Sequence, residues 1–372
     1  MDEKRGKDDR YLRHKKVDTS NLEKLETLDI NNINSFYDMT RAQGKTAFGG
    51  RAVGDAVNVL VDMVEDKNCF KVLTLSGAMT IGKMNYVIDH MIDNGMVNAV
   101  VSTGALMSHG FIESAGYAHY KDPGNITDEE LYRQGLNRIY DSLEPETNFE
   151  GVDKIICNIL NKMDKSRPTC SHELMGELGR YLDEKKEDRS PIKTAFRKGI
   201  KIYIPAFTDS EMALDFNLYN RRMRKLGKEE IRFDPFLDFN DIVGDAIKHE
   251  RWGIFTIGGG VPRNWVQQIA PYLEGLCFQE IHELKNKDFD DKPYDKKFRY
   301  GVRICPEPTH WGGLSGCTYS EGISWGKFES IEDGGRYAEV YCDATIAWPW
   351  IVKAATELLV KRGKLKYEGS QL

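Results

Sequence analysis

Apolar residues along this chain change between two spacings, which predict alternating helices and strands. Between positions 50 and 65 they recur at helical spacing, at Val53, Val57, Leu60, Val61 and Val64. A short apolar run at 71–75 then ends at Ser76-Gly77, and an amphipathic helix is predicted at 84–94. A second apolar run at 97–101 ends at Ser102-Thr103-Gly104. This succession of strand, glycine turn, helix and strand is typical of a βαβ unit in a parallel sheet.

The same alternation continues to the end of the chain. Further strands are predicted at 199–204, 252–257 and 338–341. The spacing of apolar residues predicts helices at 128–141, 152–163, 172–185, 239–249, 262–273 and 346–361. Pro262 suits the first turn of its helix. Residues 284–298 are rich in charge and are expected to form an irregular surface loop.

These elements predict an α/β fold of the Rossmann-like, doubly wound type. Its sheet would be mostly parallel, with helices on both faces, plus an N-terminal extension. Residues 1–40 are polar, carry mixed charges and are predicted to form an arm. Residues 41–366 are expected to form one domain, because no linker or internal repeat divides them.

Composition narrows the class of protein. Of 372 residues, 40% are hydrophobic and 30% charged, as in an ordinary globular enzyme. The formal net charge of −6 makes nucleic acid an unexpected partner. Seven scattered cysteines without a CxxC pair predict reduced thiols in a cytoplasmic protein. No apolar stretch approaches the roughly 18 residues of a membrane span, so no membrane association is expected.

Metal binding is not predicted. His109 and His310 are isolated along the chain and have no metal-ligand spacing. We therefore expect both to be structural or solvated.

Small and polar residues gather at five predicted strand ends. They are Ser76-Gly77, Ser102-Thr103-Gly104, Thr208-Asp209, Gly258-Gly259-Gly260 and Asp343-Ala344. In open parallel sheets, ligands bind outside these carboxyl ends, and the helix N-termini that follow favour phosphate. The pattern predicts a nucleotide-type ligand, although small residues also end strands without any ligand. The dinucleotide fingerprint GxGxxG is missing.

Two acidic residues and one lysine are candidates for amine chemistry. Asp209 and Asp215 suit a cationic ligand, or alternatively cap helices. Lys327 follows Ser324-Trp325-Gly326 in a glycine-rich stretch. An apolar wall such as Trp325 lowers a lysine pKa, and a neutral lysine can form an imine with an activated carbon. The alternative is that Lys327 is an ordinary solvated lysine.

Together these residues resemble the deoxyhypusine synthase family over about residues 45–362. The most specific match is Glu321-Gly-Ile-Ser-Trp-Gly-Lys327, which is similar to the family's lysine signature. Three other segments fall in the family's order: Phe207-Thr208-Asp209, Gly258-Gly259-Gly260-Val and Val340-Tyr-Cys-Asp343-Ala344.

The resemblance implies a reaction. Family members bind NAD, oxidise spermidine and hold its 4-aminobutyl fragment as an imine on the signature lysine, which Lys327 matches. The fragment then passes to a lysine of the hypusine-bearing translation factor, or to putrescine in related homospermidine synthases. The resemblance also implies a homotetramer with active sites at dimer interfaces.

The resemblance also implies which residues form the site, at the positions of this chain that match the family's motifs. Lys327 and Glu321 would be catalytic, and the amine substrate would contact Asp215, Asn264, Gly312 and Trp325. The NAD site would be lined by Ser76, Gly77, Thr80, Thr103, Gly104, Ala105, Asp209, Gly259, Asp343 and Ala344.

This chain departs from the family mainly on the amine side. Asn264 stands where the family has a histidine, Ser108 and His109 stand where it has acidic residues, and Leu314 replaces an aspartate. The imine and hydride chemistry is therefore expected to be retained, while the donor or acceptor can differ. The alternatives are a homospermidine synthase-type transferase with a small acceptor and a non-catalytic, NAD-binding regulatory paralogue. Intact Lys327 and Glu321 argue against the paralogue.

Overall fold

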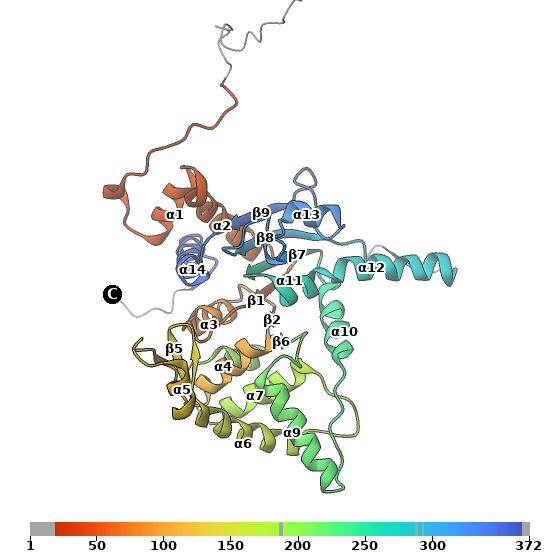
Figure 1. The fold of residues 1–372 in the computed structure, drawn as a ribbon. Helices are drawn as coiled ribbons and strands as arrows, with labels where there is room; N and C mark the ends of the chain where they lie inside the picture. Colours follow the sequence, from red (N-terminus) through yellow and green to blue (C-terminus); the bar gives the residue numbers. More distant parts are fainter. Residues whose placement is uncertain (1–18, 186–188, 287–288, 292–293, 367–372) are drawn as a thin grey trace, which may run out of the picture.

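The computed structural model describes residues 19–366 except 186–188, 287–288 and 292–293 (Figure 1). The first part of the predicted arm, residues 1–18, lies outside the described residues.

Six parallel strands form the central sheet. Their bounds are β1 Cys69–Leu75, β2 Ala99–Ser102, β6 Lys201–Tyr203, β7 Arg251–Ile257, β8 Phe298–Ile304 and β9 Arg336–Val340. The spatial order is β6-β2-β1-β7-β8-β9. Numbered by their appearance along the chain, these six strands lie in the order 3-2-1-4-5-6, which is that of the doubly wound dinucleotide-binding fold. The predicted fold class is confirmed.

Helices cover both faces of this sheet (Figure 1). Leu73 and Leu75 of β1 pack into one hydrophobic cluster, while Phe70 and Val72 pack into a second. Apolar residues on both faces explain why the strands read as continuous apolar runs. The first cluster includes residues of α2 Phe48–Glu65, α3 Asn85–Asp93, α4 Gly104–Ser114, α6 Glu146–Lys162, α7 Ser171–Glu184, α8 Pro191–Lys198, α9 Glu211–Lys225 and α14 Ala344–Lys361. The second includes α10 Pro235–Ala246, α11 Gly260–Gln267 and α12 Ile269–Phe278.

A small antiparallel sheet corrects the helix predicted at 128–141. Helix α5 (Asp128–Gln134) ends at Gly135, whose φ of 69° is left-handed. Glycine adopts this conformation without a steric penalty and commonly ends helices. The chain then forms β4 (Leu136–Ile139) and β5 (Ser142–Pro145), and β3 (Tyr120–Lys121) pairs with β5.

Three further elements differ from the predictions. Strand β8 was not predicted, because Arg299 and Arg303 interrupt its apolar pattern. Arg303 can nevertheless be buried, because it forms an ion pair at 2.8 Å with Glu339 of β9. The helix predicted at 262–273 is divided into α11 and α12. The glycine-rich stretch contains a short helix, α13 (Tyr319–Ser324).

The end of the predicted arm is helical. Helix α1 (Phe36–Gly44) packs against α2, and a Cβ added at Gly54 would lie 2.7 Å from the Gly44 nitrogen. Glu26, which precedes α1, forms an ion pair at 2.8 Å with Lys45, the C-cap of α1. This part of the arm is therefore held against the end of α1. Among the described residues, no helix has both the length and the apolar character to cross a membrane.

Candidate functional site

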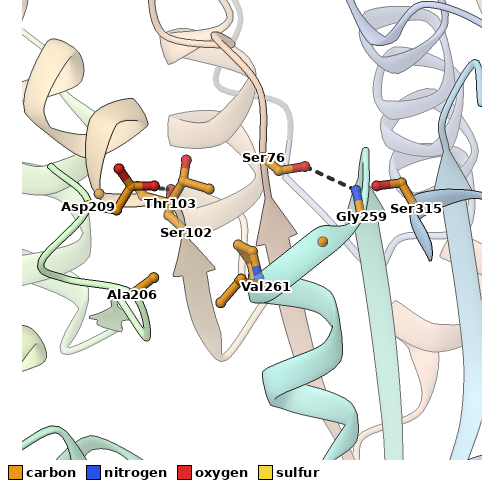
Figure 2. Close-up of a pocket in the computed structure, with 11 residues that line it drawn as sticks. Ser76, Ser102, Thr103, Ala206, Asp209, Gly259, Val261 and Ser315 are labelled. Atoms are coloured by element: carbon orange, nitrogen blue, oxygen red, sulfur yellow. Dashed lines mark hydrogen bonds between the residues drawn. The ribbon is translucent and has the colours of Figure 1, made fainter. Parts of the chain in front are cut away.

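A cavity of about 190 Å³ opens at the carboxyl ends of the central strands. Figure 2 shows residues from several strand ends facing it. Its lining is Ser76, Ser102, Thr103, Gly104, Ala206, Asp209, Gly259, Gly260, Val261, Pro262 and Ser315. Strands β1 and β7 are adjacent, and the connections after them run in opposite directions along the sheet. The cavity thus lies at the topological switch point, where doubly wound folds bind their ligands.

One wall of the cavity is the glycine backbone after β7, which hydrogen bonds to Ser76 hold in place. The Gly259 N–H donates to Ser76 Oγ at 3.0 Å, and Ser76 Oγ donates to the Ile257 carbonyl at 3.0 Å. Gly258 has a φ of 74°, which a residue with a side chain would adopt only under strain. A Cβ at Gly259 would lie 2.7 Å from Ser315 Cα. This wall therefore requires glycine at both positions.

The opposite wall is the start of helix α4. Thr103 is its N-cap, and Gly104 packs so closely against Ser210 that a Cβ there would overlap it. The first N–H groups of a helix lack intrahelical partners and attract anions. Asp209, which is exposed, adds a carboxylate beside Thr103 (Figure 2).

The structure brings together five of the residues that resemblance assigned to NAD. Ser76, Thr103, Gly104, Asp209 and Gly259 line the cavity. The other five do not line it: Gly77, Thr80, Ala105, Asp343 and Ala344.

Two of those five have structural partners of their own. The buried Thr80 hydroxyl donates to the Leu106 carbonyl at 2.7 Å, and Asp343 caps α14 by accepting the Thr345 N–H. Of the remaining lining residues, Ser102 and Gly260 belong to strand ends that were predicted to face a ligand, whereas Ala206, Val261, Pro262 and Ser315 were not proposed as site residues. Ser315 gave no sequence signal, because it follows β8, the strand that was not predicted.

These features fit a dinucleotide. A phosphate suits the N–H groups at the start of α4, and a ribose hydroxyl suits the Asp209 carboxylate. The glycine backbone at 258–260 lets a ligand approach closely. Typical small-molecule sites enclose ~300–1,000 Å³, so this cavity would hold only part of a dinucleotide.

Lys327 lies near the same region, beside helix α11. Its Nζ donates to Asn264 Oδ1 at 3.1 Å and is 5.8 Å from the centre of the Trp325 ring. Burial, followed by the positive charge of Arg263, lowers the pKa of Lys327 from its usual value. The direction of this shift is the one predicted, and Arg263 is a cause that the sequence did not suggest.

Arg263 supplies that cause. It is 4% exposed, its guanidinium lies 5.3 Å from the centre of the Tyr319 ring, and its buried Nε has no hydrogen-bond partner among the described residues. A buried cation without a carboxylate partner disfavours a second positive charge nearby. Sequence reasoning missed Arg263, which occurs in an ordinary helical position.

Several residues of the glycine-rich stretch before Lys327 are exposed. Trp325 is 67% exposed and Leu314 is 76% exposed. Glu321 and Gly312 are also exposed, and Glu321 Oε1 is 3.6 Å from Cys317 Sγ. The exposed Trp325 ring thus leaves apolar surface open beside Lys327.

Asp215 does not join Lys327. Helix α9 follows β6 at one edge of the sheet, whereas α13 precedes β9 at the other edge (Figure 1). Burial, with the negative charges of Asp153 and Glu211, raises the pKa of Asp215 to about 7. Asp215 therefore lies among carboxylates, and no cation contributes to its pKa shift.

His109 is isolated along the chain, but in the structure it has ionisable neighbours. Its Nδ1 is 2.7 Å from Glu144 Oε2, and His119 lies beside both. His310 is exposed, as predicted.

Comparison with known proteins agrees with this fold. The family description "Deoxyhypusine synthase" matches residues 38–355. "Probable deoxyhypusine synthase 2" of Methanosarcina acetivorans is 32% identical, over 89% of each chain. A "Deoxyhypusine synthase-like protein" of Chlorobaculum parvum is 31% identical, over 84% of each chain.

A solved structure shares the fold. It is titled a putative deoxyhypusine synthase from Entamoeba histolytica, with a TM-score of 0.55 at 14% identity, covering 93% of this chain and 100% of that one. The match of the family description over most of the length, together with the relatives above 30% identity, shows that this chain belongs to the deoxyhypusine synthase family.

Proposed function

We propose that this protein transfers a 4-aminobutyl group from spermidine to an acceptor amine, with Lys327 as the covalent carrier and NAD as cofactor. Family membership supports the transferase reaction. The observation that carries the covalent role is the lowered pKa of Lys327 beside α11, the helix whose first residues line the cavity.

In this proposal, different residues of the chain bind the cofactor, bind the substrate and orient Lys327. Ser76, Thr103, Gly104, Asp209 and Gly259 would hold NAD, which when bound supplies hydride acceptance and return. Trp325 offers an aromatic face to an ammonium group, and Glu321 offers a carboxylate. Asn264 accepts a hydrogen bond from Lys327 and so orients its amine.

The covalent step follows from the state of Lys327. Its neutral amine attacks the oxidised carbon of the substrate, a C–N bond forms, and propane-1,3-diamine leaves with the proton that Lys327 loses. The acceptor amine later displaces Lys327 in the same way. A depressed pKa raises the fraction of neutral lysine at a given pH, so burial and Arg263 both favour this step.

The acceptor in this proposal is a lysine of the hypusine-bearing translation factor. The alternative is a small amine, as in homospermidine synthesis, and Asn264 favours a change of substrate because it replaces a titratable histidine with a neutral amide. A homotetramer is part of the proposal, since Trp325 and Leu314 leave apolar surface beside the site.

Release of propane-1,3-diamine tests this function. Purified protein with NAD and spermidine should release it, and Lys327→Ala should abolish release while NAD binding remains. Lys228→Ala, at an exposed lysine after α9, is the matched control and should retain activity. Undiminished release by Lys327→Ala would refute the covalent role. Supplying either putrescine or the translation factor then distinguishes the two acceptors.

A further inference from the structure

Two histidines and a glutamate from separate elements meet beneath helix α4. His109 lies on α4, His119 immediately precedes β3, and Glu144 lies on β5. His109 Nδ1 is 2.7 Å and His119 Nε2 is 3.1 Å from Glu144 Oε2, and the two ring nitrogens are 3.4 Å apart. The side chains of Glu144 and His119 are 0% and 1% exposed. None of these residues has a role in the transfer reaction proposed above, although His109 stands at an amine-side position where the family has an acidic residue.

The three atoms have the spacing of metal ligands. Tetrahedral zinc with bonds of about 2.0–2.1 Å places its ligand atoms roughly 3.3 Å apart. A single ion can therefore lie about 2 Å from all three atoms with little movement. Glu144 Oε2 is fully buried, yet neither short contact gives it a hydrogen bond of acceptable geometry among the described residues. A buried carboxylate oxygen without such a bond requires a cation or proton in front of it.

The surrounding residues orient the same atoms. His119 Nδ1 is 2.8 Å from Glu113 Oε1, and Glu113 also accepts from Asn85 at 2.8 Å and pairs with Lys83. With its Nδ1 proton directed at a carboxylate, His119 can present the Nε2 lone pair to an ion. A carboxylate behind a ligating histidine is the usual outer partner of a metal site.

The geometry points to a divalent transition-metal site formed by His109, His119 and Glu144, with zinc as the expected ion. Two imidazoles and one carboxylate suit zinc, and a fourth position remains for water. The alternative occupant is a proton, which would make His119 an imidazolium between Glu113 and Glu144. Burial opposes that charge, but the two carboxylates outweigh it and raise the pKa of His119 to about 9.

A bound ion would connect the small sheet to the nucleotide side of the molecule. Gly104 of α4 lines the cavity, while His109 of the same helix would bind the ion. His109 Nε2 also lies 4.0 Å from Glu211, two residues beyond Asp209. We therefore assign the ion a positioning role for α4.

Metal content of the purified full chain tests the inference. We expect about one equivalent of zinc per chain, and Glu144→Gln and His119→Gln should lose it. The matched control is His172→Gln, because Cys170, His172 and Glu173 form the other cluster of potential ligands in the described residues. Loss of zinc in His172→Gln but not in Glu144→Gln would overturn the assignment.

A second measurement does not depend on folding of the ligand variants. Chelator-treated wild-type protein should gain several degrees in Tm with added Zn²⁺. It should also show the visible absorption of tetrahedral Co²⁺ when Co²⁺ is added instead. Glu113→Gln, which keeps all three ligands, should weaken Zn²⁺ binding about 10–100-fold. No Tm change and no Co²⁺ spectrum in wild type would mean that protons hold the cluster together.

Discussion

Arg263 is a buried cation that lowers the pKa of a nearby amine, Lys327, and so favours the nucleophilic role proposed for it. Arg263 is almost fully buried and lies close enough to lower the pKa of Lys327, after the larger effect of burial. Lys327 itself keeps contact with solvent on its open side, where an amine substrate can reach it.

Removing the charge of Arg263 should shift the pH dependence of the reaction. In Arg263→Gln the pKa of Lys327 rises, so the neutral amine appears only at higher pH. The ascending limb of the kcat profile should therefore move toward alkaline pH, and the rate near neutral pH should fall severalfold. Arg263→Lys keeps the charge and should leave the limb near its original position; an unshifted limb in Arg263→Gln would exclude this role.

Asp215 should make the protein less stable as pH rises. Its folded pKa of about 7 exceeds the ordinary value of 3.8. Between these values the folded state holds a proton that the unfolded state has lost, so the free energy of unfolding decreases as pH increases. Asp215→Asn removes this loss and should be more stable than wild type by about 1–2 kcal/mol above pH 7, after allowance for solvent screening.

Denaturant unfolding at several pH values measures this difference. Wild type and Asp215→Asn should agree below about pH 4 and separate as pH rises toward 7. Glu150→Gln, an exposed carboxylate change on the adjacent helix α6, should show no such separation. Parallel curves for Asp215→Asn and wild type would contradict the raised pKa.

At the scale of elements, the turn after β7 contacts both the end of β1 and the loop after β8. Gly259 packs against Ser315 and donates a hydrogen bond to Ser76, so the ends of β1 and β7 and the loop after β8 meet at one glycine. Gly259→Ala would place a Cβ 2.7 Å from Ser315 Cα and should weaken NAD binding about tenfold or more, measured by calorimetry. Gly244→Ala in α10 has open space for its Cβ and should bind NAD normally. Equal affinity in both variants would remove Gly259 from the site.

Regular periodicity explains which elements could be predicted from the sequence. The buried parallel strands β1, β2 and β7 are apolar runs that end in glycine or serine, so both their existence and their ends were predicted. Strand β8 was missed because its buried Arg303 pairs with Glu339, a contact between distant residues. The helix predicted at 128–141 was too long, although Gly135 is a residue type that commonly ends helices.

Part of the site could also be predicted, because some of its residues lie at strand ends that have a local sequence signal. Residues at strand ends, such as Ser76 and Asp209, carry local signals and line the cavity. Ser315 and Arg263 act through tertiary contacts and gave no local signal. The cluster of His109, His119 and Glu144 spans 36 positions of the chain, so its proximity depends on the small sheet that the sequence did not predict.

At the scale of the whole molecule, the proposed amine residues occupy opposite edges of the sheet. Asp215 lies on α9 and Lys327 follows α13 (Figure 1). The exposed Trp325 lies beside Lys327, and Leu314 of the same glycine-rich stretch and Val261 of α11 are also exposed. A second copy that covered this surface could bring its own α9 to Lys327 and exclude water from the amine.

Mixing Lys327→Ala with Asp215→Asn tests that arrangement, because each variant alone should be inactive if both residues contact the substrate. If Asp215 and Lys327 act from different copies, co-refolded Lys327→Ala and Asp215→Asn should form some sites free of both changes. Random pairing into dimers would restore roughly a quarter of wild-type release of propane-1,3-diamine. A mixture that stays as inactive as either variant alone would place both residues in a site within one chain.

The central claim is that Lys327 carries the substrate fragment. The most direct measurement is borohydride trapping of protein incubated with NAD and spermidine, followed by peptide mass spectrometry. The account predicts a reduced aminobutyl adduct on the peptide containing Lys327, present in Lys228→Ala and absent in Lys327→Ala. Propane-1,3-diamine release without any adduct on Lys327, or an adduct on another lysine, would contradict it.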